Sequence, residues 1–229
     1  MRPVTRAGWL AADSAEAARL QWAGLRGRDR PEDFEDGSLR PVIALPGVYE
    51  TWHFMLPIIR TLHQRGHPVH VLPTLAHNSR PIVDTARMVA DVVERRDLAD
   101  LVIVAHSKGG LIGKYAMIEL DPGHRLARML AVASPFSGSR YASYAPSRAL
   151  RAFRPTDPTT VRLMKERTIN SRITSVFPAF DPLVPEGSEL PGAENIRLPI
   201  GGHWTPLTHP TTLAVAVELA SARPGDEPA

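Results

Sequence analysis

The sequence predicts an α/β fold, with a mostly parallel six-stranded sheet flanked by helices and a short helical insertion. Three observations predict it. From Pro41 onward, short apolar runs alternate with longer segments of helical apolar spacing, as in proteins built from repeated strand–helix units. The 229 residues, 43% of them hydrophobic, are enough for one sizeable core. Between Ala133 and Ile173, two short helix-like segments replace the single crossover helix.

The alternation assigns the elements of a single domain over residues 40–222. Strands are expected at residues 41–45, 68–72, 101–105, 126–133, 173–177 and 195–199. Helices are expected at residues 51–65, 82–95, 109–120 and 209–222. The helix at 82–95 has the clearest pattern, because Ile82, Val89 and Val93 fall on one face. Residues 223–229 are rich in Pro, Gly and acidic side chains and are expected to be a disordered tail.

Residues 1–39 are expected to form a helix and a loop that pack on this domain. Asp13 followed by Glu16 resembles a capping box, which would start the helix at that point. The apolar stripe expected to face the core consists of Ala18, Trp22 and Leu25. No catalytic role is expected for this segment.

Residues 134–170 are expected to form a lid or cap insertion over the carboxyl ends of the strands. Its first short helix carries Leu150 and Phe153. Its second begins at Asp157, a capping residue followed by proline at the first helical position. Long insertions at such places often act as lids or substrate walls. The alternative is that these apolar residues simply belong to the core.

The composition excludes several classes of function. There is no cysteine, which excludes thiol catalysis and disulfides. The net charge is only +3 and no basic block is interleaved with aromatic residues, so no nucleic-acid partner is expected. No histidine pair has the H-E-x-x-H spacing of a zinc site. With no transmembrane-length run and no signal-peptide core in residues 1–13, we expect a cytoplasmic protein, and a secreted mature form stays open.

Ser107 is the most informative residue of the chain. It follows the apolar run 101–105 and precedes the glycine pair Gly109 and Gly110. This pattern predicts a serine at the tip of a sharp strand-to-helix turn, whose strained backbone needs small neighbours. Ala105 stands where the G-x-S-x-G motif has glycine, a place where one methyl group is tolerated. The alternative is an ordinary turn with an exposed serine.

A serine nucleophile needs a general base, and the base needs a carboxylate to orient it. Asp181 follows the strand expected at 173–177, with Glu186 as the fallback. His203 follows the last strand, in a loop opened by paired glycines. His209 competes with it, but stands beside a proline at the start of the last helix, a position typical of a cap. The order serine, aspartate, histidine is the one that nucleophile-elbow hydrolases use.

Two backbone N–H groups should face the negative charge that develops during acyl transfer. One is expected from Lys108, the residue after the serine. The other is expected from Val48, in a loop where Gly47 lets the backbone approach closely. The alternative for this loop is a plain turn. The Lys108 ammonium is expected to be solvated on the surface, although it could attract an acidic group of a substrate.

These segments together resemble the α/β-hydrolase superfamily, in particular compact bacterial lipases and esterases of the triacylglycerol-lipase type. The resemblance extends over residues 41–222. The matching segments are 45–48, 105–110, 133–138, 181–185 and 202–207. The family's two leading antiparallel strands have no clear counterpart, which indicates a minimal version of the fold with the N-terminal helix in their place.

The resemblance implies a serine hydrolase that cleaves acyl esters without a metal or organic cofactor. Ser107, Asp181 and His203 would be catalytic, and the N–H groups of Val48 and Lys108 would form the oxyanion hole. The substrate would be a small-molecule or lipid-like ester. The apolar pocket is expected to be lined by Phe54, Met55, Phe136, Tyr141, Tyr144, Phe153 and Trp204. A thioesterase, an acyltransferase or a non-catalytic binding protein on the same scaffold are the alternatives.

Overall fold

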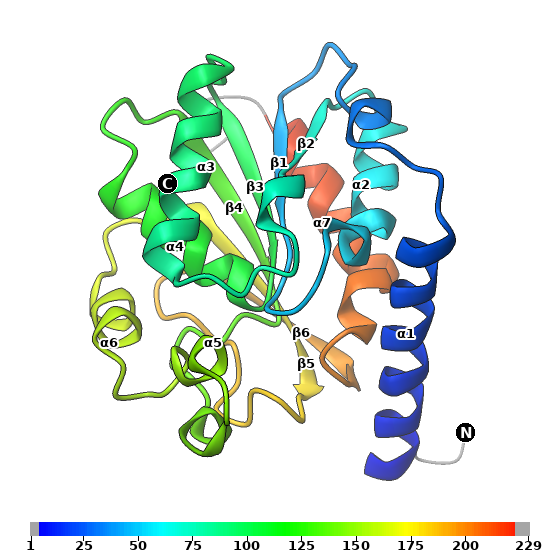
Figure 1. The fold of residues 1–229 in the computed structure, drawn as a ribbon, viewed down its shortest axis with the longest axis vertical. Helices are drawn as coiled ribbons and strands as arrows, with labels where there is room; N and C mark the ends of the chain where they lie inside the picture. The colour runs from blue at the N-terminus through cyan, green and yellow to red at the C-terminus, as the bar shows by residue number, and fades with distance from the viewer. Residues whose placement is uncertain (1–4, 223–229) are drawn as a thin grey trace.

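A computed structural model describes residues 5–222 as one six-stranded sheet with helices on both faces (Figure 1). The strand order is β2-β1-β3-β4-β5-β6, and all neighbouring strands are parallel. The strands are β1 (Val42–Leu45), β2 (Val69–Val71), β3 (Leu101–His106), β4 (Leu126–Val132), β5 (Ile173–Phe180) and β6 (Glu194–Gly201). The predicted fold class is confirmed, and the described sheet is wholly parallel.

The register of the central strands brings their carboxyl ends to one edge of the sheet. Leu45 of β1 pairs with Ala105 of β3, and His106 of β3 pairs with Val132 of β4. Both β1 and β3 are buried along their whole length, which explains their uninterrupted apolar sequence. The turns that follow these strands therefore meet at the same edge, where ligands bind in open parallel sheets.

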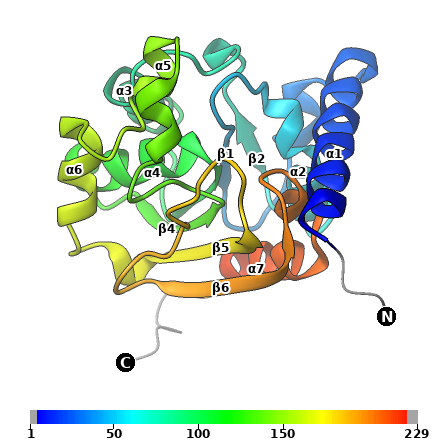
Figure 2. The same cartoon turned by 90° about the horizontal axis from the view of Figure 1, so that it is seen from below.

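The helices form two apolar layers against the sheet. The helices are α1 (Arg6–Arg26), α2 (Leu56–His63), α3 (Ile82–Arg95), α4 (Lys108–Glu119), α5 (Arg148–Arg151), α6 (Pro158–Lys165) and α7 (Pro210–Ser221). One core contains buried side chains of α2 and α7, and the other those of α3 and α4. Figure 2 shows α5 and α6 on the side of α3 and α4, with α1 at the far end of the molecule.

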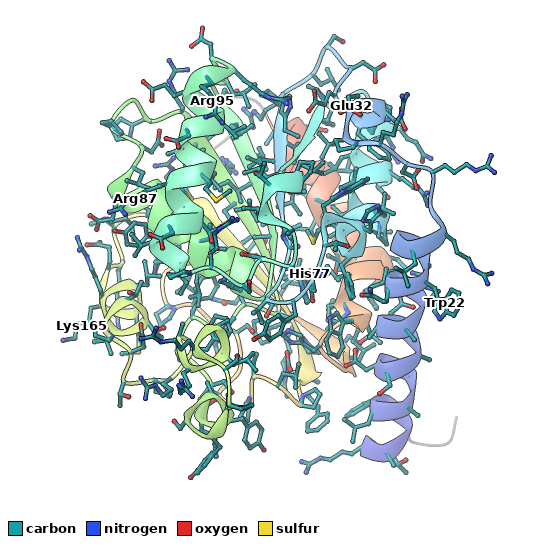
Figure 3. The ribbon with its side chains drawn as sticks, in the orientation of Figure 1. Trp22, Glu32, His77, Arg87, Arg95 and Lys165 are labelled. Carbon is teal, nitrogen blue, oxygen red and sulfur yellow. The ribbon has the colours of Figure 1, made fainter. Side chains whose placement is uncertain are left out.

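The N-terminal helix differs from its prediction in both start and orientation. Helix α1 begins at Arg6, and the Thr5 side chain caps it by accepting from a backbone N–H. Asp13 is therefore in mid-helix, and it is 3% exposed. Trp22 and Leu25 are 54% and 71% exposed, and Figure 3 shows Trp22 pointing away from the fold. The predicted capping box and apolar stripe are both wrong, because the helix packs through a different face that contains a carboxylate.

Two further segments refine the expected elements. The helix expected at 51–65 is a 3₁₀ turn, Trp52–Met55, followed by α2. In the insertion at 134–170, a 3₁₀ turn at Arg140–Tyr144 precedes α5 and α6, and Asp157 caps α6 as the sequence predicts. No helix in the described part of the chain is long and apolar enough to cross a membrane. The tail predicted at 223–229 lies outside the described residues.

Candidate active site

Ser107 lies in the turn between β3 and α4, with a φ of 50° that a non-glycine residue adopts only under strain. Its N–H donates to the carbonyl of Val132 (2.8 Å). A Cβ at Gly109 would lie 2.2 Å from the carbonyl oxygen of Leu45, and one at Gly110 would lie 2.1 Å from a serine hydroxyl. Only glycine fits at these two positions, so the pair lets α4 start directly against the strand ends.

The turns after β5 and β6 bring Asp181 and His203 together. The Nδ1–H of His203 donates to Oδ2 of Asp181 (2.8 Å), and both side chains are buried. Oδ1 of the same carboxylate accepts from the N–H groups of Leu183 (2.8 Å) and Val184 (3.0 Å). The carboxylate is thus fixed on both oxygens. In this tautomer, Nε2 of His203 is the ring nitrogen left to accept a proton.

Glu186 and His209, the alternatives to Asp181 and His203, have other partners. Glu186 accepts from the backbone N–H of Arg140 and from its Nε–H (2.7 Å). Nδ1 of His209 accepts from the N–H of Thr211 (3.2 Å), which makes it the N-cap of α7. The structure therefore pairs Asp181 with His203, and places neither Glu186 nor His209 at this pair.

Neighbouring charges set the protonation of the pair. Burial alone raises the pKa of Asp181, but the charge and hydrogen bond of His203 and two backbone N–H groups hold that pKa below its usual value. Burial alone lowers the pKa of His203, but Asp181, and more weakly Glu50 and Asp13, raise it above its usual value. Asp181 is therefore a stable anion that favours the protonated form of the His203 imidazole.

Helix α1 contributes a carboxylate to the loop that carries His203. Oδ2 of Asp13 accepts from the N–H of His203 (2.8 Å), and Oδ1 accepts from those of Trp204 (2.7 Å) and Thr205 (3.0 Å). A Cβ at Gly202, where φ is 125°, would lie 2.4 Å from Oδ1 of Asp13. The N-terminal helix therefore reaches the site, whereas the sequence suggested only packing on the core.

A second buried network surrounds Glu50. Its Oε2 accepts from Nδ1 of His106 (2.8 Å) and from the N–H of Gly47 (2.6 Å). Its Oε1 accepts from Nε1–H of Trp204 (2.7 Å). Nε2 of His106 faces the carbonyl oxygen of His203 (3.0 Å). Because both ring nitrogens of His106 face oxygen acceptors, the two bonds form together only in the doubly protonated ring.

The N–H groups of Val48 and Lys108 are among the unpaired backbone donors of the loop after β1 and of the first turn of α4. The N–H of Gly47 is occupied by Glu50. Among the described residues, the N–H of Val48 donates to no protein acceptor. As the first residue of α4, Lys108 has an N–H without an intrahelical acceptor. The arrangement fits the oxyanion hole that the sequence predicts.

The side chain of Lys108 is buried, so the expectation of a solvated surface lysine is wrong. Its Nζ donates to the carbonyl oxygens of Asn78 (2.6 Å) and Arg80. Burial lowers its pKa to about 8. The Asn78 side chain in turn donates to the carbonyl of Pro46 (2.7 Å). Lys108 thus anchors the loop before α3 to the start of α4, and its ammonium is not presented to a substrate.

Ser107 and His203 line one apolar cavity of about 190 Å³. Three of the seven predicted pocket residues, Tyr141, Phe153 and Trp204, also line it. The structure does not bring the other four there. Phe54, Met55 and Phe136 are buried in the cores, and Tyr144 is 87% exposed. The remaining apolar walls are Val48, Pro135, Ala142, Ala145, Leu150, Leu183 and Val184.

Several of these residues escaped the sequence reasoning. Leu150 and the two alanines lie in the insertion, which supplies one wall of the cavity. Asp13 is predicted to start the helix, and no role is predicted for His106. The sequence does offer one signal for Glu50 and His106, which is their closeness to predicted site residues. Glu50 comes shortly after Val48, and His106 immediately precedes Ser107. For Asp13, the sequence offers no comparable signal.

Comparison with solved structures identifies the fold. The mature lipase BlEst2 of Bacillus licheniformis superimposes with a TM-score of 0.60 at 15% identity, over 85% of this chain and 96% of that one. An extracellular α/β-hydrolase from a Paenibacillus species gives 0.55 at 15%, over 81% and 100%. The non-heme bromoperoxidase BpoC of Mycobacterium tuberculosis gives 0.61 at 15%, over 81% and 92%. The protein therefore has the α/β-hydrolase fold.

In sequence, no protein-family model and no curated protein matches the chain. The structural neighbours include lipases and a bromoperoxidase, so the shared fold leaves the reaction open. The reaction has to be argued from the residues of the site itself.

Proposed function

We propose that the protein is a serine hydrolase that cleaves carboxylic esters through an acyl-enzyme. The observation that carries this proposal is the Asp181–His203 hydrogen bond of 2.8 Å, at a cavity that His203 shares with the strained Ser107. A buried base with a fixed tautomer, in the same cavity as a serine at the tip of a strained turn, is the arrangement that activates a hydroxyl. The lipases among the structural neighbours support the same class of reaction.

The proposed mechanism has two steps. Nε2 of His203 takes the hydroxyl proton of Ser107 as its Oγ attacks the ester carbonyl, and the N–H groups of Val48 and Lys108 stabilise the resulting oxyanion. The carbonyl re-forms, and His203 gives the proton to the leaving alcohol. Water, deprotonated by His203, then attacks the acyl-enzyme; as the bond to Oγ breaks and the acid leaves, His203 returns the proton to Ser107. Asp181 stabilises the protonated imidazole in both steps.

The size and lining of the cavity indicate the acyl group. Its volume of about 190 Å³ is walled by apolar side chains, apart from Ser107, His203, Glu50 and Ser139. An apolar protein cavity of roughly 150 Å³ holds one benzene molecule. We therefore propose that the acyl groups preferred here are uncharged and carry about four to eight carbons.

The test combines an active-site probe with a series of substrates. A fluorophosphonate should label the wild-type protein and leave Ser107→Ala unlabelled, with circular dichroism showing that the variant is folded. p-Nitrophenyl esters of increasing chain length should show a maximum in kcat/KM at medium length and a decline for long chains. Absence of labelling together with absence of turnover over the whole series would overturn the proposed function.

A further inference from the structure

Three loops of the candidate site converge on the carboxylate of Glu50. We propose that Glu50 is a positioning residue for acyl transfer. It fixes the relative positions of three loops: the one that carries Val48, the turn that carries Ser107 and the one that carries His203. This inference rests on the proposed function. Glu50 is 4% exposed and lies at the wall of the cavity that contains Ser107 and His203.

Each hydrogen bond of Glu50 reaches a different loop. The bond from Gly47 N–H (2.6 Å) fixes the peptide next to the Val48 donor. The bond from His106 (2.8 Å) holds the residue that immediately precedes Ser107. The bond from Trp204 Nε1–H (2.7 Å) holds the residue that immediately follows His203. A change at Glu50 therefore displaces the oxyanion donor, the nucleophile and the base together.

The three partners are all donors, and this explains why the position requires a carboxylate. Gly47 N–H and the Nδ1–H of His106 meet one oxygen, and the Trp204 indole N–H meets the other. A glutamine has a single acceptor oxygen, so in either orientation its NH₂ group would face a donor N–H. The ionised form is favoured here: burial raises the pKa of Glu50, but His106, His203 and the Gly47 N–H together hold it below its usual value.

Glu50→Gln keeps the shape of the side chain and removes one acceptor. We expect kcat to fall about 10- to 100-fold, because displacement of reacting groups by an ångström costs about that much. KM should change less than about threefold, since the apolar walls of the cavity are untouched. The substrate is the p-nitrophenyl ester that the wild-type protein hydrolyses fastest.

Asp121→Asn is the matched control for lost stability. Asp121 is also a buried carboxylate, and its two oxygens accept from the N–H groups of Arg125 (2.7 Å) and Leu126 (3.0 Å), where the turn after α4 enters β4. Its amide variant meets the same donor conflict at a distance from the candidate site. We expect lower thermal stability and an unchanged kcat for Asp121→Asn.

A double-mutant cycle with Trp204→Phe separates positioning from general destabilisation. Removing the indole donor lets the amide of Glu50→Gln turn its NH₂ group toward an apolar ring, with its oxygen facing Gly47 and His106. Glu50→Gln should therefore cost several-fold less in kcat in the Trp204→Phe background than in the wild type.

The outcomes distinguish this inference from the proposed function. An active wild type whose Glu50→Gln variant keeps its kcat would overturn the positioning role alone. So would equal costs of Glu50→Gln in the two backgrounds, or a matching kcat loss in Asp121→Asn. A wild-type protein with no esterase activity and no probe labelling would overturn the proposed function and the positioning role with it.

Discussion

The Ser107 turn follows the buried strand β3, whereas the His203 loop follows β6, a largely exposed strand at the edge of the sheet, and the two are held in place differently. The serine turn is fixed by its own glycines and by the adjacent ends of β1 and β4. The histidine loop is fixed by Asp13, which lies 190 positions earlier in the chain, and by Glu50 through a neighbouring tryptophan. One half of the candidate site is thus encoded locally and the other half by tertiary contacts.

This difference has a physical consequence. A tight turn with strained φ tolerates only small neighbours, so a pattern of a few residues specifies it. A loop held by carboxylates that accept from its backbone N–H groups is specified less by its own side chains, apart from the glycine required at Gly202, and more by the distant acceptors. Substitutions far from His203 in the sequence should therefore affect this proposed base, whereas Ser107, the proposed nucleophile, should respond mainly to its immediate neighbours.

The largest expected effect separates His203 from His209. His203→Ala should lower kcat by about 10⁴- to 10⁶-fold, as removal of the base does in serine hydrolases. His209→Ala removes only an N-cap of α7 and should leave kcat within about threefold, with a loss of about 1 kcal/mol in unfolding free energy. Steady-state ester hydrolysis and urea denaturation measure both. The reverse ranking would move the base to His209.

A smaller but still large effect is expected at the locally encoded turn. Gly109→Ala places a methyl group 2.2 Å from a backbone oxygen of β1, which must shift. We expect about 1–3 kcal/mol of destabilisation and a loss of about 100-fold in kcat as Ser107 moves. Gly123→Ala, where a Cβ meets nothing closer than 3.7 Å, is the control and should be near neutral. Equal activities for the two variants would contradict the account of the turn.

The same division explains what the sequence could predict. The strands, the Ser107 turn and the order of Ser107, Asp181 and His203 follow from apolar periodicity and local turn chemistry. The orientation of α1 does not, because Asp13 is buried by partners almost the whole chain away. The burial of Lys108 was missed for the same reason: two backbone carbonyls of a distant loop solvate its ammonium. Residue type alone suggests the surface for Lys108 and a helix cap for Asp13.

Asp13→Asn tests whether tertiary contacts from α1 hold the His203 loop in place. The amide keeps one acceptor oxygen for three backbone N–H groups, so at least one donor is left poorly paired. We expect about 1–3 kcal/mol of lost stability and about a tenfold lower kcat. Glu16→Gln on the same helix, whose carboxylate pairs with Arg19 (2.7 Å), is the control. If Asp13→Asn matched this control in activity, α1 would have no part in holding the base.

The smallest expected effect is a shift in the pH dependence of kcat/KM, a quantity that depends on both halves of the site. Only unprotonated His203 can act as the base, and its pKa is raised, so kcat/KM should rise with pH through a value above about 6.5. The charged or titratable groups that face His203 are Asp181, Glu50, Asp13 and His106. Asp181→Asn removes the strongest of the raising charges, and should move this acid limb to lower pH while lowering the plateau.

The stability linked to His203 should run in the opposite direction to activity. A raised folded-state pKa means that the folded protein binds the proton more tightly than the unfolded chain. Its stabilisation is therefore complete below the unfolded pKa of about 6.5 and disappears as pH rises through the folded value. The difference in unfolding free energy between wild type and His203→Asn, measured from pH 5 to 9, should shrink over the same range in which kcat/KM rises. A constant difference would mean that the carboxylates orient His203 without holding its proton.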